Sequence, residues 1–120
     1  MDFGDTDPSA WRGGEQRAAP ASEVRFSRRE LDRILRLYGR MVAAGEWRDY
    51  AIDFLKDRAV ISVFRRSSEM PIYRIEKNPR LERRQGAYSV ISATGHILRR
   101  GHELDRVLNA LDRSLRVVAG

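Results

Sequence analysis

Two amphipathic helical patterns lie near opposite ends of this chain, and each needs another layer of structure to pack against. The first carries an apolar stripe at helical spacing, made of Leu31, Ile34, Leu35, Tyr38, Met41 and Val42. The second, within residues 103–118, carries a stripe made of Leu104, Val107, Leu108, Leu111, Leu115 and Val118. A helix that is apolar on one side must bury that side against another element. The segment between the two helices therefore has to supply that element.

The first helix has sequence signals at both of its ends. Ser27 and Glu30 have the spacing of a capping box, and Phe26 and Leu31 have that of a hydrophobic staple. Gly45 follows the last apolar positions, which is typical of a left-handed C-terminal cap. We therefore expect a helix that begins after Ser27 and ends near residue 44.

Five short segments between the helices have the pattern of β-strands. The expected strands are residues 50–55, 59–64, 72–77, 87–92 and 96–99, and residues 78–86 form a basic loop or short helical turn. The predicted fold class is α+β in the order α-β-β-β-β-β-α. An antiparallel meander sheet packs on the N- and C-terminal helices as a two-layer sandwich. Both helices can cover one sheet face, which leaves the other for a partner; a homodimer through that face is one candidate.

Composition limits the domain organisation and the setting of the chain. With 120 residues and 42% apolar side chains, the chain can build one core. Residues 1–25 mix Gly, Pro, Ser and Ala without a period, so we expect a flexible, acidic-leaning tail before a single basic α+β domain over residues 26–120. No apolar stretch approaches the ~20 residues of a membrane helix, and no signal-peptide pattern is visible. We expect a cytoplasmic protein without a membrane partner.

The charge of the chain favours an anionic partner. The formal net charge is +6, and all but two of the 23 basic residues are arginine. A GC-rich genome also favours arginine codons, so the ratio of arginine to lysine does not by itself indicate function. A basic domain nevertheless attracts acidic protein surfaces and nucleic acids.

Four arginines form a row on the first helix. Arg29, Arg33, Arg36 and Arg40 recur at i, i+4, i+7 and i+11, on the side away from the apolar stripe. Guanidinium groups bind carboxylates and phosphates in bidentate fashion, so the row is a candidate binding surface for such a partner. The alternative is an ordinary solvated helix face.

A second candidate lies just before the last helix. Arg99, Arg100, Gly101 and His102 precede the point where a helix N-terminus would offer unpaired N–H groups to an anion. The acidic first turn at residues 103–105 already complements the helix dipole, which favours an ordinary strand-to-helix turn. A third basic cluster lies in the loop, at Lys77, Arg80, Arg83 and Arg84. The sequence does not show whether the three clusters share one side.

Signals for catalysis are absent from the sequence. The chain has no cysteine, and its two histidines do not have a metal-binding spacing. No nucleophile elbow or glycine-rich phosphate loop is present. We expect no catalytic, cofactor or metal site. The favoured function is a non-enzymatic interaction or regulatory domain that recognises an acidic protein partner and self-associates; the alternative is a nucleic-acid-associated protein whose arginines contact phosphates.

Long segments of the chain resemble the Domain of Unknown Function 2794 family, which consists of small proteins of alphaproteobacteria. The resemblance is carried by LYGRMVAAGEWRDYAIDFL (37–55), PIYRIEKNPRL (71–81), QGAYSVI (85–91) and GHILRRGHEL (95–104). It extends over nearly all of the chain after the tail. The resemblance implies a single domain in a bacterial cytoplasm and brings no functional residues with it.

Overall fold

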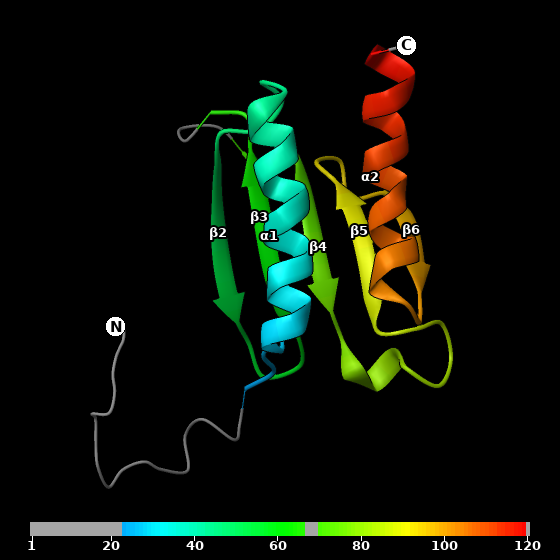
Figure 1. The fold of residues 1–120 in the computed structure, drawn as a ribbon. Helices are drawn as coiled ribbons and strands as arrows, with labels where there is room; N and C mark the ends of the chain where they lie inside the picture. The colour runs from blue at the N-terminus through cyan, green and yellow to red at the C-terminus, as the bar shows by residue number, and fades with distance from the viewer. Residues whose placement is uncertain (1–22, 67–69, 120) are drawn as a thin grey trace, which may run out of the picture.

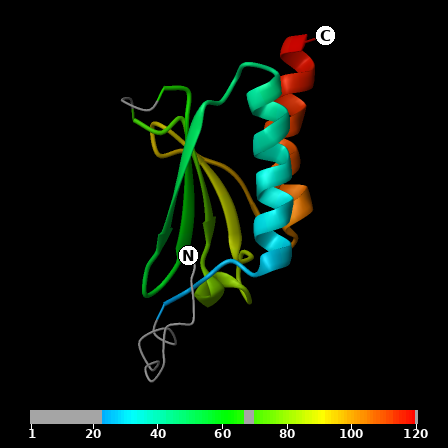
Figure 2. The ribbon, with the colours of Figure 1, turned by 60° about the vertical axis from the view of Figure 1, so that its left-hand side comes forward.

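A five-stranded sheet lies under two helices that run in the same direction (Figure 1). The computed structural model describes residues 23–66 and 70–119, with the side chains of all but residues 113–119. Both helices lie on the same face of the sheet (Figure 2). The result is a two-layer α+β sandwich.

Helix α1 (Arg28–Ala43) has the ends that its sequence predicts. The Ser27 hydroxyl accepts a hydrogen bond from the Glu30 backbone N–H at 3.1 Å, and the Glu30 carboxylate accepts one from the Ser27 N–H at 2.7 Å. The capping box is therefore confirmed. At the other end, Gly45 has a φ of 79° and donates its N–H to the Val42 carbonyl at 2.9 Å. This is the left-handed cap that only glycine adopts without strain.

The sheet is a simple antiparallel meander in which strands adjacent in sequence are adjacent in space. It consists of β2 (Asp49–Phe54), β3 (Ala59–Phe64), β4 (Tyr73–Lys77), β5 (Tyr88–Ser92) and β6 (Ile97–Gly101). A short 3-10 helix, η3 (Pro79–Leu81), lies between β4 and β5, and α2 (Leu104–Ala119) follows β6. The predicted element order and meander are confirmed.

The core lies between the sheet and the two helices. Its most deeply buried side chains are Ile34 and Leu37 of α1, Ile61, Val63, Ile75 and Val90 of the sheet, and Val107, Leu108 and Leu111 of α2. Trp47, at the corner between α1 and β2, is also buried and contacts this cluster. The most deeply buried residues of the central strands alternate along the sequence, because successive side chains of a β-strand point to opposite faces of the sheet.

The opposite face of the sheet has no helix over it in the described part of the chain (Figure 2). One cross-strand row of this open face runs in register from β2 to β6, through Asp53, Val60, Glu76, Ser89 and Arg100. Val60 is only 7% exposed although no backbone layer covers it. On the same face, Glu76 pairs with Arg58 at 3.5 Å and with Arg74 at 3.7 Å, so long polar side chains cross this surface.

One strand is longer than predicted. The sequence suggested residues 96–99, but β6 covers Ile97–Gly101 because Arg100 and Gly101 pair with Ser89 and Tyr88 of β5. Of the tail expected over residues 1–25, residues 1–22 lie outside the described residues. The apolar stripe positions Leu115 and Val118 of the second helix lie in the part of α2 whose side chains are not described. None of the described helices is long and apolar enough to span a membrane.

Candidate functional site

Both helices begin at the same end of the molecule, and the connection between β4 and β5 lies at that end (Figure 1). This connection packs directly on the junction between β6 and α2. Gly86 lies so close to Gly101 that a Cβ added to Gly86 would be 2.0 Å from the Gly101 carbonyl carbon. Glu82 contacts the His102 ring nitrogen Nδ1 at 3.2 Å, and Gln85 accepts a hydrogen bond from Arg100. The basic loop cluster and the second candidate cluster therefore lie side by side at this end.

A groove of about 640 Å³ separates the first turns of α1 and α2. Its walls include Arg29, Arg33 and Arg36 from α1, and His102 and Asp105 from the start of α2. We call it the helix-start groove. It brings the arginine row of the first helix next to the second candidate cluster, which the sequence could not show.

Two arginines of the row join the helices. Arg33 Nε lies 2.6 Å from Asp105 Oδ1, and Arg40 Nη2 lies 2.6 Å from Asp112 Oδ2. The arginines are seven residues apart, and so are the aspartates, which matches two helices that run in parallel. These ion pairs use Arg33 and Arg40 within the molecule, in contrast to the outward-facing role expected for the whole row.

The other two arginines of the row remain accessible. Arg29 and Arg36 are exposed, and neither forms an ion pair with any residue that the structure describes. They are also seven residues apart, on the flank of the row formed by Arg33 and Arg40. The candidate surface of α1 is therefore this outer pair of guanidinium groups.

A half-buried polar cluster forms the floor of the groove. The Tyr88 hydroxyl donates to the Glu30 carboxylate, and Lys77 Nζ lies 2.9 Å from Glu30 Oε1. Burial raises the pKa of Glu30, but hydrogen bonds from Tyr88, Lys77 and the Ser27 N–H outweigh it and leave that pKa below its usual value. Burial and the bond to Glu30 raise the pKa of Tyr88. Lys77, placed in the basic loop cluster by the sequence, is thus held inside the structure.

The extra length of β6 places three residues of the second candidate cluster on a strand. Arg99 and Arg100 are adjacent strand residues, so their side chains leave opposite faces of the sheet. Arg100 Nε donates to Ser89 Oγ at 3.2 Å on the open face. His102 is at the start of α2, beside Glu82. All four residues of the cluster nevertheless line one small pocket of about 280 Å³, which they share with Glu103, Arg106 and Val107.

Comparison with known proteins identifies the family. Residues 24–108 match the family model described as "Protein of unknown function (DUF2794)". The chain belongs to this family. No curated protein and no solved structure matches it. The span shared with the DUF2794 family includes the whole sheet and every residue named in the helix-start groove, and it ends at Leu108, before the ion-paired Asp112.

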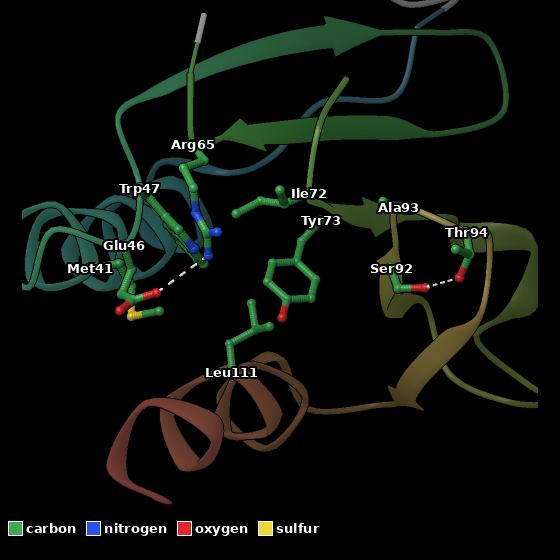
Figure 3. Close-up of a pocket in the computed structure, with 10 residues that line it drawn as sticks. All are labelled: Met41, Glu46, Trp47, Arg65, Ile72, Tyr73, Ser92, Ala93, Thr94 and Leu111. Carbon is green, nitrogen blue, oxygen red and sulfur yellow. Dashed lines mark hydrogen bonds and ion pairs between the residues drawn. The ribbon is translucent and has the colours of Figure 1, made fainter. Parts of the chain in front are cut away.

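The DUF2794 domain has a second cavity near the far end of α1, of about 440 Å³. Met41, Trp47, Arg65, Tyr73 and Leu111 are among the residues that line it (Figure 3). We call it the Trp47 pocket. The sequence does not reveal this cavity, because its walls come from segments far apart along the chain. No group of three or more potential metal ligands occurs among the described residues.

Proposed function

We propose that this protein is a non-enzymatic interaction domain that binds an acidic helical segment of a protein partner along Arg29 and Arg36. The two guanidinium groups are exposed, two helical turns apart, and have no ion-pair partner among the described residues. The rise of an α-helix places their Cα atoms about 10 Å apart. A partner helix with carboxylates seven residues apart matches this spacing.

The contact between α1 and α2 is an internal model for this mode of binding. Arg33 and Arg40 already hold α2 through its two aspartates, Asp105 and Asp112. Arg29 and Arg36 repeat the same seven-residue spacing on the outer flank of α1. A second acidic helix can dock there in the same geometry, and this spacing is the observation that supports the proposal most strongly.

The acidic residues around the groove favour a protein partner over a nucleic acid. Glu103 and Asp105 lie at the rim, beside the arginines of α1. DNA carries one charge per ~1.7 Å of helix axis, so its phosphates would lie against these carboxylates. A helix with a few spaced carboxylates avoids this repulsion.

The open sheet face supports a second part of the proposal, which is self-association. Its cross-strand row is acidic at Asp53 on β2 and basic at Arg100 on β6. A two-fold axis parallel to the strands would place β2 of one copy over β6 of the other. Asp53 of each copy then faces Arg100 of its partner, Val60 faces Ser89, and the two copies of Glu76 meet at the axis, where each is paired with Arg58 and Arg74 of its own chain.

The test of the arginine pair compares two double variants that have the same change in charge. Arg29→Glu with Arg36→Glu reverses the proposed surface, and Arg48→Glu with Lys56→Glu reverses two exposed cations elsewhere. The probe is a labelled helical peptide with glutamates seven residues apart, and its binding is followed by fluorescence anisotropy. We expect the first variant to lose at least about tenfold in affinity and the second much less. Equal losses would contradict the proposal.

A further inference from the structure

The Trp47 pocket lies where six parts of the chain meet, one of which is Arg65, just after β3. Met41 comes from α1, Trp47 from the corner after it, Tyr73 from β4 and Leu111 from α2, while residues 92–94 close the far side (Figure 3). Its volume of about 440 Å³ falls in the range of sites for small molecules. The cavity is thus large enough for one small organic ligand.

The walls of the pocket are apolar and aromatic. The rings of Trp47 and Tyr73 have centroids 6.3 Å apart and are tilted by 52°. Figure 3 shows the Tyr73 ring extending between Ile72 and Leu111. Its hydroxyl forms no hydrogen bond with any described residue, so it is available to a ligand. A branched or aromatic side chain of a ligand would find suitable contacts here.

One ion pair supplies both signs of charge at the edge of the pocket. Arg65 Nη2 lies 3.6 Å from Glu46 Oε1, and the two side chains are 60% and 36% exposed. At this distance and exposure the pair is loose, and its guanidinium and carboxylate can each take a new partner. A ligand with only one charge would compete with one member of the pair. A ligand that carries an ammonium and a carboxylate satisfies both members.

We propose that the Trp47 pocket binds a free α-amino acid with an apolar side chain, such as leucine or phenylalanine. The α-carboxylate binds Arg65, the α-ammonium binds Glu46, and the side chain packs against Met41, Tyr73 and Leu111. This site is separate from the arginine surface of α1, and the proposal does not depend on the function proposed above.

The test uses ¹⁵N-labelled full-length protein titrated with L-leucine and observed by NMR. The chain has two tryptophans, so Trp11→Phe assigns the indole N–H signal of Trp47. We expect a saturable shift of that signal with half-saturation below about 1 mM. Isoamylamine lacks the carboxylate and 4-methylpentanoate lacks the ammonium. Each should bind at least about tenfold more weakly, because each loses one charge-assisted contact.

Variants test the two charged residues. Arg65→Gln and Glu46→Gln should each weaken leucine binding by about tenfold, whereas Arg48→Gln, an exposed neighbour outside the pocket, should not. The exposed positions of Arg65 and Glu46 should leave the melting temperature nearly unchanged, which separates lost binding from lost folding. The proposal is overturned by any of three results: no saturable shift with leucine or phenylalanine, binding of both analogues as tight as that of leucine, or unchanged leucine binding in both Gln variants.

Discussion

Arg33 on α1 and Asp105 on α2 form an ion pair with an Nε–Oδ1 distance of 2.6 Å across 72 residues of sequence. It joins the two helices near the end where both begin, and Arg40 with Asp112 repeats it seven residues further along. Half of a row that looks like a binding surface in the sequence is therefore part of the fold. The other half, Arg29 and Arg36, is free to bind a partner, and this division underlies the proposed function.

The floor of the helix-start groove makes a prediction about stability. Tyr88→Phe removes the hydroxyl that donates to the half-buried Glu30 carboxylate. We expect it to lower the free energy of unfolding by about 1–3 kcal/mol, since a bond to a charged group is lost. Tyr50→Phe is the control, because Tyr50 is exposed and its hydroxyl has no hydrogen bond within the described residues. Urea denaturation measures the free energy of unfolding of both variants. Equal losses in the two variants would show that the Tyr88–Glu30 hydrogen bond does not stabilise the fold.

The lowered pKa of Glu30 also predicts how the stability of the protein depends on pH. Its pKa in the folded protein lies below the usual 4.5, so folding favours the charged carboxylate. That contribution is fully present above pH 4.5 and is lost as the pH falls through the folded pKa. Glu30→Gln should therefore be less stable than wild type near neutral pH, and the difference should shrink in acid. Urea midpoints of both proteins, measured at a series of acidic pH values, test this. A difference in midpoint between wild type and Glu30→Gln that stays constant as the pH falls would contradict the prediction.

The close approach of two glycines predicts an unusually sensitive position. Gly86 and Gly95 both have positive φ, at 98° and 92°, but only Gly86 has backbone atoms within 4 Å of an added Cβ. Gly95→Ala should cost about 1–2 kcal/mol from backbone strain alone. Gly86→Ala should cost clearly more, because Gly101 and the β4–β5 connection must move apart. Thermal unfolding compares the two, and similar melting temperatures would contradict the packing described here.

The open sheet face predicts a charge-dependent dimer. Asp53→Arg and Arg100→Asp should each weaken self-association by about tenfold, because each places like charges opposite one another across the two-fold axis. The double variant should recover part of the loss, since the opposite charges are restored with their positions exchanged. Sedimentation equilibrium measures the dissociation constants. A monomer at all concentrations, or two single variants that behave like wild type, would reject the homodimer.

Local features of the fold could be predicted from the sequence because local chemistry determines them. Ser27 with Glu30 marks the start of α1, Gly45 its end, and the strand patterns and their order follow from periodicity and short connections. The pairing of Arg33 with Asp105 could not be predicted in the same way. A helical period gives the face of a residue but not the direction of the neighbouring helix. The matched spacing of Asp105 and Asp112 was the one available signal.

Sites formed by segments far apart along the chain could not be predicted from the sequence either. The helix-start groove depends on how the first turns of α1 and α2 lie beside each other over Tyr88 of β5. The extension of β6 to Gly101 depends on the pairing of Gly101 with Tyr88, which the local pattern of residues 96–102 does not show. The Trp47 pocket needs the spacing between α1 and α2, which only the three-dimensional packing of the core determines.

A salt series on the wild-type protein tests whether Arg29 and Arg36 recognise an acidic helix of a protein. Anisotropy titrations of wild-type protein would compare the glutamate peptide, its glutamine counterpart and double-stranded DNA of equal length at several salt concentrations. The account predicts that at ~0.15 M salt the glutamate peptide binds more tightly than both of the others. Tighter binding of DNA, with a steep loss of affinity as salt rises, would contradict it and assign the arginines to phosphates.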